Sequence, residues 1–183
     1  MPSIRGLKKT LRENITNYRY EFVLFASVAI YSIVFSYFTF LKHYSFSSFG
    51  WDLGIFNQVF YTTIFTDKFM FYTAELYLNP TGSYFAIHFS PILLLLTPFY
   101  AIFPSAVTLL VLKSVVLGIG AIPLYYLSKE FTDDKLTSLL ISISYLLSPS
   151  IQGSNWYDFQ QQILIPLLLF SLFYYFIKKR WRK

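Results

Sequence analysis

Two carboxylates stand out because aromatic residues surround each of them at a predicted edge of a membrane. Asp52 follows Trp51, and Asp158 lies between Tyr157 and Phe159. A carboxylate at such a boundary is costly unless it is paired, binds a cation or transfers a proton. The alternative for each is helix capping, in which the side chain accepts backbone N–H bonds at a helix start. Both interpretations stay open, since capping does not exclude function.

A histidine and several polar residues are predicted on the same face as these carboxylates. His88 is either an interfacial histidine with one wet edge, or a metal ligand or proton donor near the carboxylates. Asp67 and Glu75 are most simply solvated loop charges. Besides the two carboxylates, the polar residues predicted on the outer face are Asn57, Gln58, Asp67, Glu75, His88, Asn155, Gln160, Gln161 and Gln162.

A lysine interrupts an otherwise apolar segment. Lys113 stands about two turns into a predicted helix over 105–128. A lysine inside a membrane is a functional-site hypothesis by default. We expect it to pair with Asp158 or Asp52, or to meet a lipid phosphate from the outer side; the alternative is that it snorkels to the outer interface. Lys113 and Gln58 are our candidates for contacts with a bound cofactor.

The composition assigns these residues to an integral membrane protein. Hydrophobic residues make up 55% of the 183-residue chain, and charged residues only 13%. Because backbone polar groups must be paired internally in lipid, the spans are expected to be helices. The chain has no cysteine and two histidines, and it lacks a Walker motif, so we expect no disulfide, no haem and no nucleotide site. The chain has a net charge of +6, and most of its basic residues flank apolar segments. This position is typical of topology signals and lipid contacts rather than of nucleic-acid binding.

The distribution of charge predicts the topology. Both ends are basic, so the positive-inside rule predicts both termini in the cytoplasm and an even number of spans. The apolar segment 86–103 contains prolines that divide it, so it is predicted to be interfacial or re-entrant. The fold class is therefore an all-α, multi-pass membrane protein with one domain. Its parts are a basic arm (1–21), spans at 22–41, 105–128, 136–149 and 161–177, an outer loop (42–103) and a basic tail (178–183).

The outer loop is predicted to contain structure of its own. Apolar residues recur near helical spacing over 51–66, which predicts a helix lying in the membrane interface. The segment 86–103 would be a second such helix, and a turn at 79–82 separates the two. A short loop is expected over 150–160, between the last two spans.

Four short motifs carry a family resemblance that covers residues 22–177. They are DLGIFNQ at 52–58, HFSPILL at 88–94 with PFY at 98–100, GAIPLY at 120–125, and DF at 158–159. Together they resemble a family of predicted polytopic membrane proteins of unknown function, found in archaea and bacteria. That family is similar to the GT-C glycosyltransferases. One departure is that family members read Asp-Phe-His where this chain has Gln160 in third place.

The resemblance implies a location in an archaeal plasma membrane and sugar transfer from a polyprenyl-phosphate donor on its outer face. Asp52 matches the acid of the first outer loop, which serves as base or metal ligand in GT-C enzymes. Asp158 matches an acid at the outer end of the third span, and His88 lies where residues contact substrate. We therefore expect Asp52, Asp158 and His88 to be catalytic, with Asp52 and Asp158 holding a divalent cation, Mg²⁺ or Mn²⁺.

A second function is open. The chain resembles a short N-terminal portion of a GT-C enzyme, and such a bundle can serve as a non-catalytic accessory subunit of a larger membrane complex. The expected partners are membrane lipids, polyprenyl phosphate and other membrane polypeptides.

Overall fold

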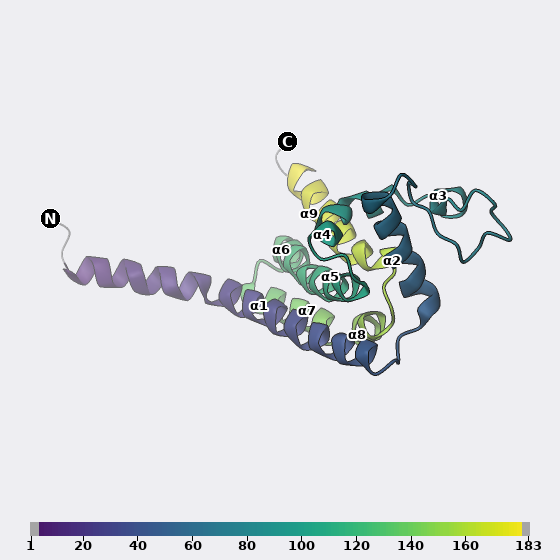
Figure 1. Cartoon of the computed structure of the whole chain (residues 1–183). Helices are drawn as coiled ribbons and strands as arrows, with labels where there is room; N and C mark the ends of the chain where they lie inside the picture. Colours follow the sequence, from purple (N-terminus) through teal and green to yellow (C-terminus); the bar gives the residue numbers. More distant parts are fainter. Residues whose placement is uncertain (1–3, 181–183) are drawn as a thin grey trace.

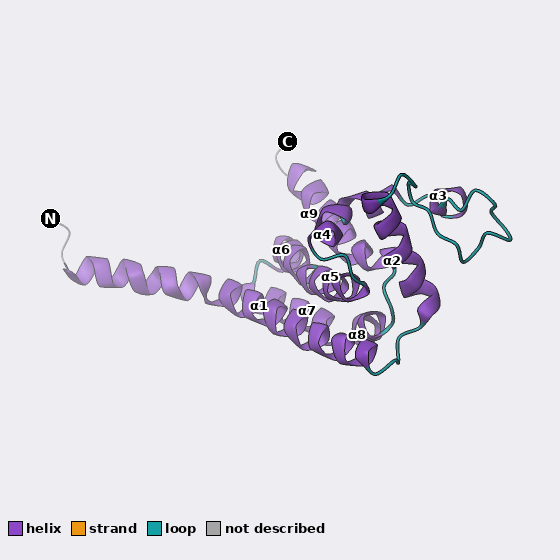
Figure 2. Ribbon diagram, viewed as in Figure 1, coloured by secondary structure: helices purple, strands orange, loops and turns teal. Residues whose placement is uncertain are grey.

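The computed structural model describes residues 4–180 and the side chains of residues 18–179, so most of the basic arm and the end of the basic tail lie outside the described side chains. Within these limits the chain consists of helices and loops (Figure 2), which confirms the predicted all-α class. The helices are α1 (Ile4–Tyr44), α2 (Gly50–Phe65), α3 (Tyr84–Ile87), η1 (Pro91–Leu95), α4 (Thr97–Ile102), α5 (Ala106–Ile119), α6 (Ala121–Thr132), α7 (Lys135–Leu147), α8 (Pro149–Trp156), η2 (Gln161–Leu164) and α9 (Ile165–Arg180).

Three helical segments are long and apolar enough to cross a membrane. They are Tyr18–Tyr44, Ala106–Thr132 and Gln161–Lys179, and they correspond to three of the predicted spans. The fourth prediction, 136–149, falls on α7, which has 13 residues. At 1.5 Å per residue this helix is about 20 Å long, short of a hydrocarbon core of about 30 Å. The multi-pass architecture is therefore established, and the count of four spans stays a prediction.

The bundle is built around α1 and the continuous pair α5 and α6. α1 lies along α5 and α7, and α6 packs against α7 and α9, while the first turns of α1 extend away from the bundle (Figure 1). Gly118 sets the distance between α1 and α5. A Cβ atom at that position would lie 2.6 Å from the Ser32 Oγ atom and 3.3 Å from the Tyr31 ring. The two helices can approach this closely because residue 118 has no side chain.

Side-chain caps and prolines fix where the helices begin. The Ser105 hydroxyl accepts a hydrogen bond from the Val107 N–H at 3.2 Å at the start of α5. The Asp134 carboxylate accepts the Thr137 N–H at 2.7 Å and starts α7. Hydrogen bonds from the Thr137 side chain and then from its backbone stabilise the ionised form and lower the pKa of Asp134. Pro149 is the first residue of α8, a position that suits its fixed φ angle.

Two segments differ from the sequence-based expectation. The segment 150–160, predicted as a loop, contains α8, because Pro149 ends α7 but also opens a new helix. The segment 86–103, predicted as one interfacial helix, is divided into the end of α3, η1 and α4, with Pro91 and Pro98 near the start of the last two. The prediction over 51–66 agrees with α2 to within one residue at each end.

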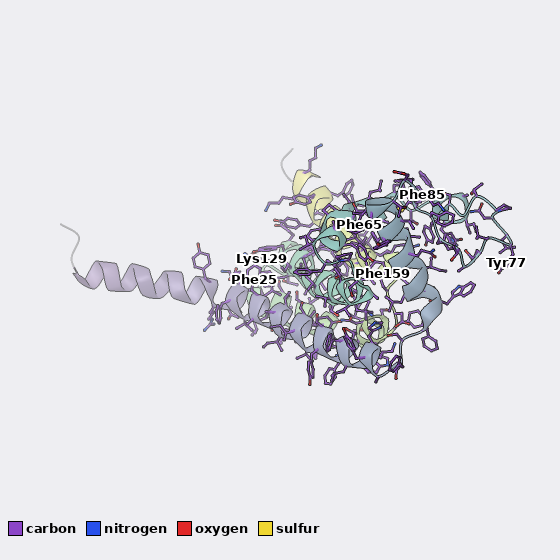
Figure 3. The ribbon with its side chains drawn as sticks, in the orientation of Figure 1. Phe25, Phe65, Tyr77, Phe85, Lys129 and Phe159 are labelled. Atoms are coloured by element: carbon purple, nitrogen blue, oxygen red, sulfur yellow. The ribbon has the colours of Figure 1, made fainter. Side chains whose placement is uncertain are left out.

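Aromatic packing joins α2 to the segment between α8 and η2. Phe159 is fully buried, and its ring lies 5.1 Å from Phe56 and 6.2 Å from Phe60, centroid to centroid. Phe159 lies inside the molecule in Figure 3, whereas Tyr77 lies at the tip of the loop that carries α3. This buried contact fixes the segment that carries the candidate site.

Candidate functional site

Two lysines hold the segment 156–158, which leads from α8 towards η2. Lys42, near the end of α1, donates hydrogen bonds to the Trp156 carbonyl at 3.0 Å and to the Asp158 Oδ1 atom at 3.2 Å. Lys113, from α5, donates to the Tyr157 carbonyl. We call this set of residues the lysine clamp. It fixes three consecutive residues of one loop against two different helices.

Asp158 contacts the start of α2 and not the start of the last span. Its Oδ2 atom accepts the Phe49 N–H at 2.5 Å, at the start of α2, while its Oδ1 atom is paired with Lys42. The last span begins at Gln161, three residues further on, so Asp158 does not start it. The side chain of Asp158 is 1% exposed, and both of its oxygens are engaged by the protein.

Lys113 neither snorkels to the interface nor forms the ion pair with Asp158 that we expected. Its side chain is fully buried, and the Tyr157 carbonyl accepts its hydrogen bond. The cation that pairs with Asp158 is Lys42 instead. Beside Lys113, the Ser114 hydroxyl donates to the Asn155 Oδ1 atom at 2.9 Å. The α5–α8 contact is thus polar although it lies among apolar helices.

Asp52 lies in the first turn of α2 and is half-buried. Its Oδ2 atom accepts hydrogen bonds from the Tyr157 hydroxyl at 2.8 Å and from the Gln160 amide at 3.5 Å. The hydrogen bond to Asp52 raises the pKa of Tyr157, because an ionised phenol beside a carboxylate would be repelled. Tyr157 therefore stays a hydrogen-bond donor at neutral pH, and it links Asp52 to the lysine clamp.

Asp52 faces a pocket of about 220 Å³. We call it the Asp52 pocket, and its walls come from α2, the α3 loop and the start of η2. The structure brings five of the predicted outer-face residues to Asp52, because Glu75, His88 and the three glutamines Gln160, Gln161 and Gln162 all line this pocket. The full lining is Trp51, Asp52, Ile55, Phe56, Glu75, Tyr84, His88, Gln160, Gln161 and Gln162.

Two aromatic hydroxyls shape the electrostatics of the pocket. Burial raises the pKa of Tyr84 to about 12, and its hydroxyl lies 3.3 Å from the Gln161 amide oxygen. Tyr72 donates a hydrogen bond to Glu75, and burial together with this carboxylate raises the pKa of Tyr72. Both phenols are therefore neutral donors at physiological pH. Glu75, interpreted from the sequence as a solvated loop charge, is instead a hydrogen-bonded wall residue.

Other predicted residues lie elsewhere. The Gln58 Oε1 atom accepts from the Thr73 N–H at 3.0 Å, so Gln58 ties α2 to the following loop and does not line the pocket. Among the described side chains, no group of three or more carboxylates and imidazoles that could hold a metal ion is found. Asp52 and Asp158 have separate partners, so the residues placed here do not fit a shared divalent cation.

The sequence did not single out Lys42, Tyr157 or Tyr84 for the site. In the sequence Lys42 is the charged residue that ends the apolar run 22–41, and a charged residue in that position is common at the end of any membrane span. Tyr157 was noted as an aromatic neighbour of Asp158, whereas its hydroxyl serves Asp52. Both contacts join residues more than 100 positions apart, and no local pattern reveals such a pairing.

The fold and the site define a class: a polytopic α-helical membrane protein with a buried lysine clamp below a carboxylate-lined pocket. A family model described as predicted membrane protein (DUF2079) matches residues 42–183, and the chain belongs to that family. The matched range contains the lysine clamp and the Asp52 pocket. Searches of curated proteins and of solved structures each gave no match. The expected membership of a membrane-protein family of unknown function is thereby confirmed.

Proposed function

We propose that the protein transfers a sugar from a polyprenyl-phosphate donor, with the chemistry in the Asp52 pocket. The observation that carries the proposal is the arrangement of Asp52: a half-buried carboxylate, held through one oxygen, on the wall of a pocket that His88 also lines. Within the described residues the Oδ1 atom of Asp52 meets no protein donor, which suits a general base that must accept a proton from substrate.

The chemistry of the pocket walls supports a sugar as the group that is moved. Trp51 and Tyr84 offer aromatic faces, and the three glutamines offer amide donors and acceptors. Hydroxyl groups of a sugar hydrogen-bond to amides and carboxylates, while its apolar ring face packs on aromatic rings. His88 is 5.3 Å from the Tyr84 ring, centroid to centroid, and is exposed.

In this reaction Asp52 removes the proton from an acceptor hydroxyl as its oxygen attacks the anomeric carbon of the sugar. The bond from that carbon to the phosphate oxygen breaks, and its electron pair leaves with the polyprenyl phosphate. His88 is the group at the pocket that can donate a proton to the departing phosphate. The proposed reaction uses no divalent cation. Asp158 acts at a distance by holding the start of α2.

Replacement of Asp52 tests this proposal. Wild type and Asp52→Asn are reconstituted in nanodiscs and supplied with a panel of short-chain polyprenyl-phosphate sugars and candidate acceptors. We expect Asp52→Asn to lose between about 10²- and 10⁴-fold in transfer rate, the usual contribution of a general base. Asp67→Asn is the matched control, because Asp67 is an exposed carboxylate of the same loop. Equal rates in wild type and Asp52→Asn would refute the role of Asp52.

A second function, accessory subunit of a larger membrane complex, is favoured by the apolar surface of the last span. Only 11% of the apolar window in Gln161–Lys179 is buried within the chain. Lipid or another polypeptide must cover the rest. Purification in mild detergent followed by mass spectrometry separates the two: foreign polypeptides in stoichiometric amounts favour the subunit, and a bound polyprenyl phosphate favours the transferase.

A further inference from the structure

A second pocket, of about 360 Å³, lies on the other side of the segment that carries Gln160 and Gln162. We call it the α8 pocket. Gln160 and Gln162 line both it and the Asp52 pocket, so these glutamines form a common wall. Because Gln160 also lies 3.5 Å from the Asp52 carboxylate, a molecule in the α8 pocket would be one side chain away from the candidate base.

The walls of the α8 pocket combine apolar and polar side chains. Leu117 and Pro166 belong to two of the membrane-spanning segments, and Ile151 and Ile163 add further apolar wall residues. Ser154 and Gln162 contribute a hydroxyl and an amide. A pocket with walls from membrane spans and with neutral hydrogen-bonding groups matches an amphipathic lipid rather than a water-soluble sugar.

Charge decides which lipid headgroup suits this pocket. Asp158 is the charged residue in its lining, and Lys42 neutralises it. Neither Lys42 nor Lys113 is part of the lining, because both are held by the segment 156–158. A phosphate would therefore find no cation in the lining to pair with, and an unpaired charge is unfavourable in a partly buried site. Hydroxyl groups meet no such penalty.

We propose that the α8 pocket binds an uncharged lipid that carries a free hydroxyl group. The acyl or isoprenoid chain lies against the apolar wall, and the hydroxyl end hydrogen-bonds to Gln162 and Ser154. Binding itself does not depend on the proposed function. Use of this lipid as the acceptor of the sugar rests on that function, since its hydroxyl must then reach Asp52 past the common wall.

Photolabelling tests the binding site without an activity assay. The full chain in phosphatidylcholine nanodiscs is exposed to a diazirine-labelled diacylglycerol, or to the corresponding phosphatidic acid with the same chain. We expect the diacylglycerol to label peptides that contain residues 149–166, and unlabelled diacylglycerol to compete. Phosphatidic acid should label these peptides roughly tenfold less, the effect of a single unfavourable charge contact. Equal labelling by the two probes would overturn the choice of an uncharged headgroup.

Gly153→Leu is the blocking variant. A Cβ atom at Gly153 meets nothing within 4 Å, so a larger side chain can enter the α8 pocket without disturbing the backbone. Gly54→Leu is the matched control, because its Cβ also meets nothing within 4 Å and it lines neither pocket. Labelling should fall roughly tenfold in Gly153→Leu and stay unchanged in Gly54→Leu. Unchanged labelling in Gly153→Leu would assign the probe to the surrounding bilayer and overturn the site.

A further variant keeps the test independent of folding and of transfer. Gln162 is exposed, and replacing it with alanine removes a polar wall group from the α8 pocket. Gln162→Ala should reduce diacylglycerol labelling about threefold, the loss of one modest hydrogen bond. Asp52→Asn should label like wild type. Retained labelling with an unchanged transfer rate in Asp52→Asn refutes the proposed function alone, and absence of labelling in wild type refutes the lipid site alone.

Discussion

At the scale of single residues, the molecule depends on an ion pair with almost no access to water. The side chains of Lys42 and Asp158 are 8% and 1% exposed. Removing one partner of such a pair leaves an uncompensated buried charge, which is strongly destabilising, whereas replacing both with apolar groups is often tolerated. The pair also determines structure, because Asp158 holds the N-terminus of α2 and Lys42 holds the Trp156 carbonyl.

The first prediction concerns this pair. Asp158→Ala should lower the free energy of unfolding by about 3–5 kcal/mol, because Lys42 is left buried without its counter-charge. The double variant Lys42→Met, Asp158→Leu should recover most of that loss. Denaturant unfolding in detergent micelles measures both, with the exposed Asp67→Ala as control. A single variant as stable as wild type would contradict the ion pair.

The second prediction concerns pH and the hydrogen bond from Tyr157 to Asp52. Since the pKa of Tyr157 is raised in the folded protein, its stabilising effect is complete below the ordinary tyrosine pKa of about 10 and is lost as pH rises through the higher folded value. The difference in melting temperature between wild type and Tyr157→Phe should therefore be constant from about pH 7 to about pH 9 and shrink only above about pH 10. A difference that vanishes below about pH 9 would be inconsistent with this bond.

Sequence reasoning identified Asp52, His88 and Asp158 as unusual because each is costly or reactive at a membrane edge. It could not tell which of them share a pocket. Asp52 and His88 do, whereas Asp158 belongs to the lysine clamp. The two carboxylates are separated at the start of α2. Asp52, in the first turn of this helix, lines the pocket, whereas Asp158 accepts the N–H of Phe49, the N-cap residue that precedes α2. Such facts depend on tertiary packing, which residue types alone do not specify.

At the scale of elements, the length of the apolar runs predicted three spans correctly, whereas the loop predicted after Pro149 contains a helix. Long, predominantly apolar runs have few alternatives to a membrane helix, so 22–41, 105–128 and 161–177 fall on helices of the structure. Pro149 ends α7 as expected, but a proline is equally suited to begin a helix, and α8 follows at once. The sequence carries both possibilities, and packing of α8 against α5 and α7 selects one.

The third prediction tests the close approach of α1 and α5 at Gly118. Gly118→Ala should destabilise the protein by about 1–3 kcal/mol, because its Cβ would press on Ser32 and Tyr31. Ser32→Gly in the same chain should relieve most of the strain. Gly54→Ala is the control, since that site is open. Unfolding of the four proteins in micelles measures the effect, and a neutral Gly118→Ala would show that the helices can move apart freely.

At the scale of the whole molecule, the predicted orientation rests on the distribution of charge, and it is testable because the chain has no cysteine. The fourth prediction is that Tyr77→Cys reacts with a membrane-impermeant maleimide added outside intact cells, and that Phe131→Cys reacts only after the membrane is opened. Both side chains are well exposed, at 75% and 72%. The reverse pattern of labelling would mean that the termini are outside.

The lysine clamp also has a consequence for biosynthesis. Lys42 and its acceptor Asp158 are 116 positions apart in the sequence, and Lys113 donates to the carbonyl of Tyr157, which is 44 positions further on. During synthesis, α1 and α5 must therefore enter the insertion machinery or the bilayer before the ammonium group of either lysine can reach its acceptor. Chains halted before residue 156 would leave both ammonium groups without these acceptors, so the lysine clamp can form only after α8 has been made.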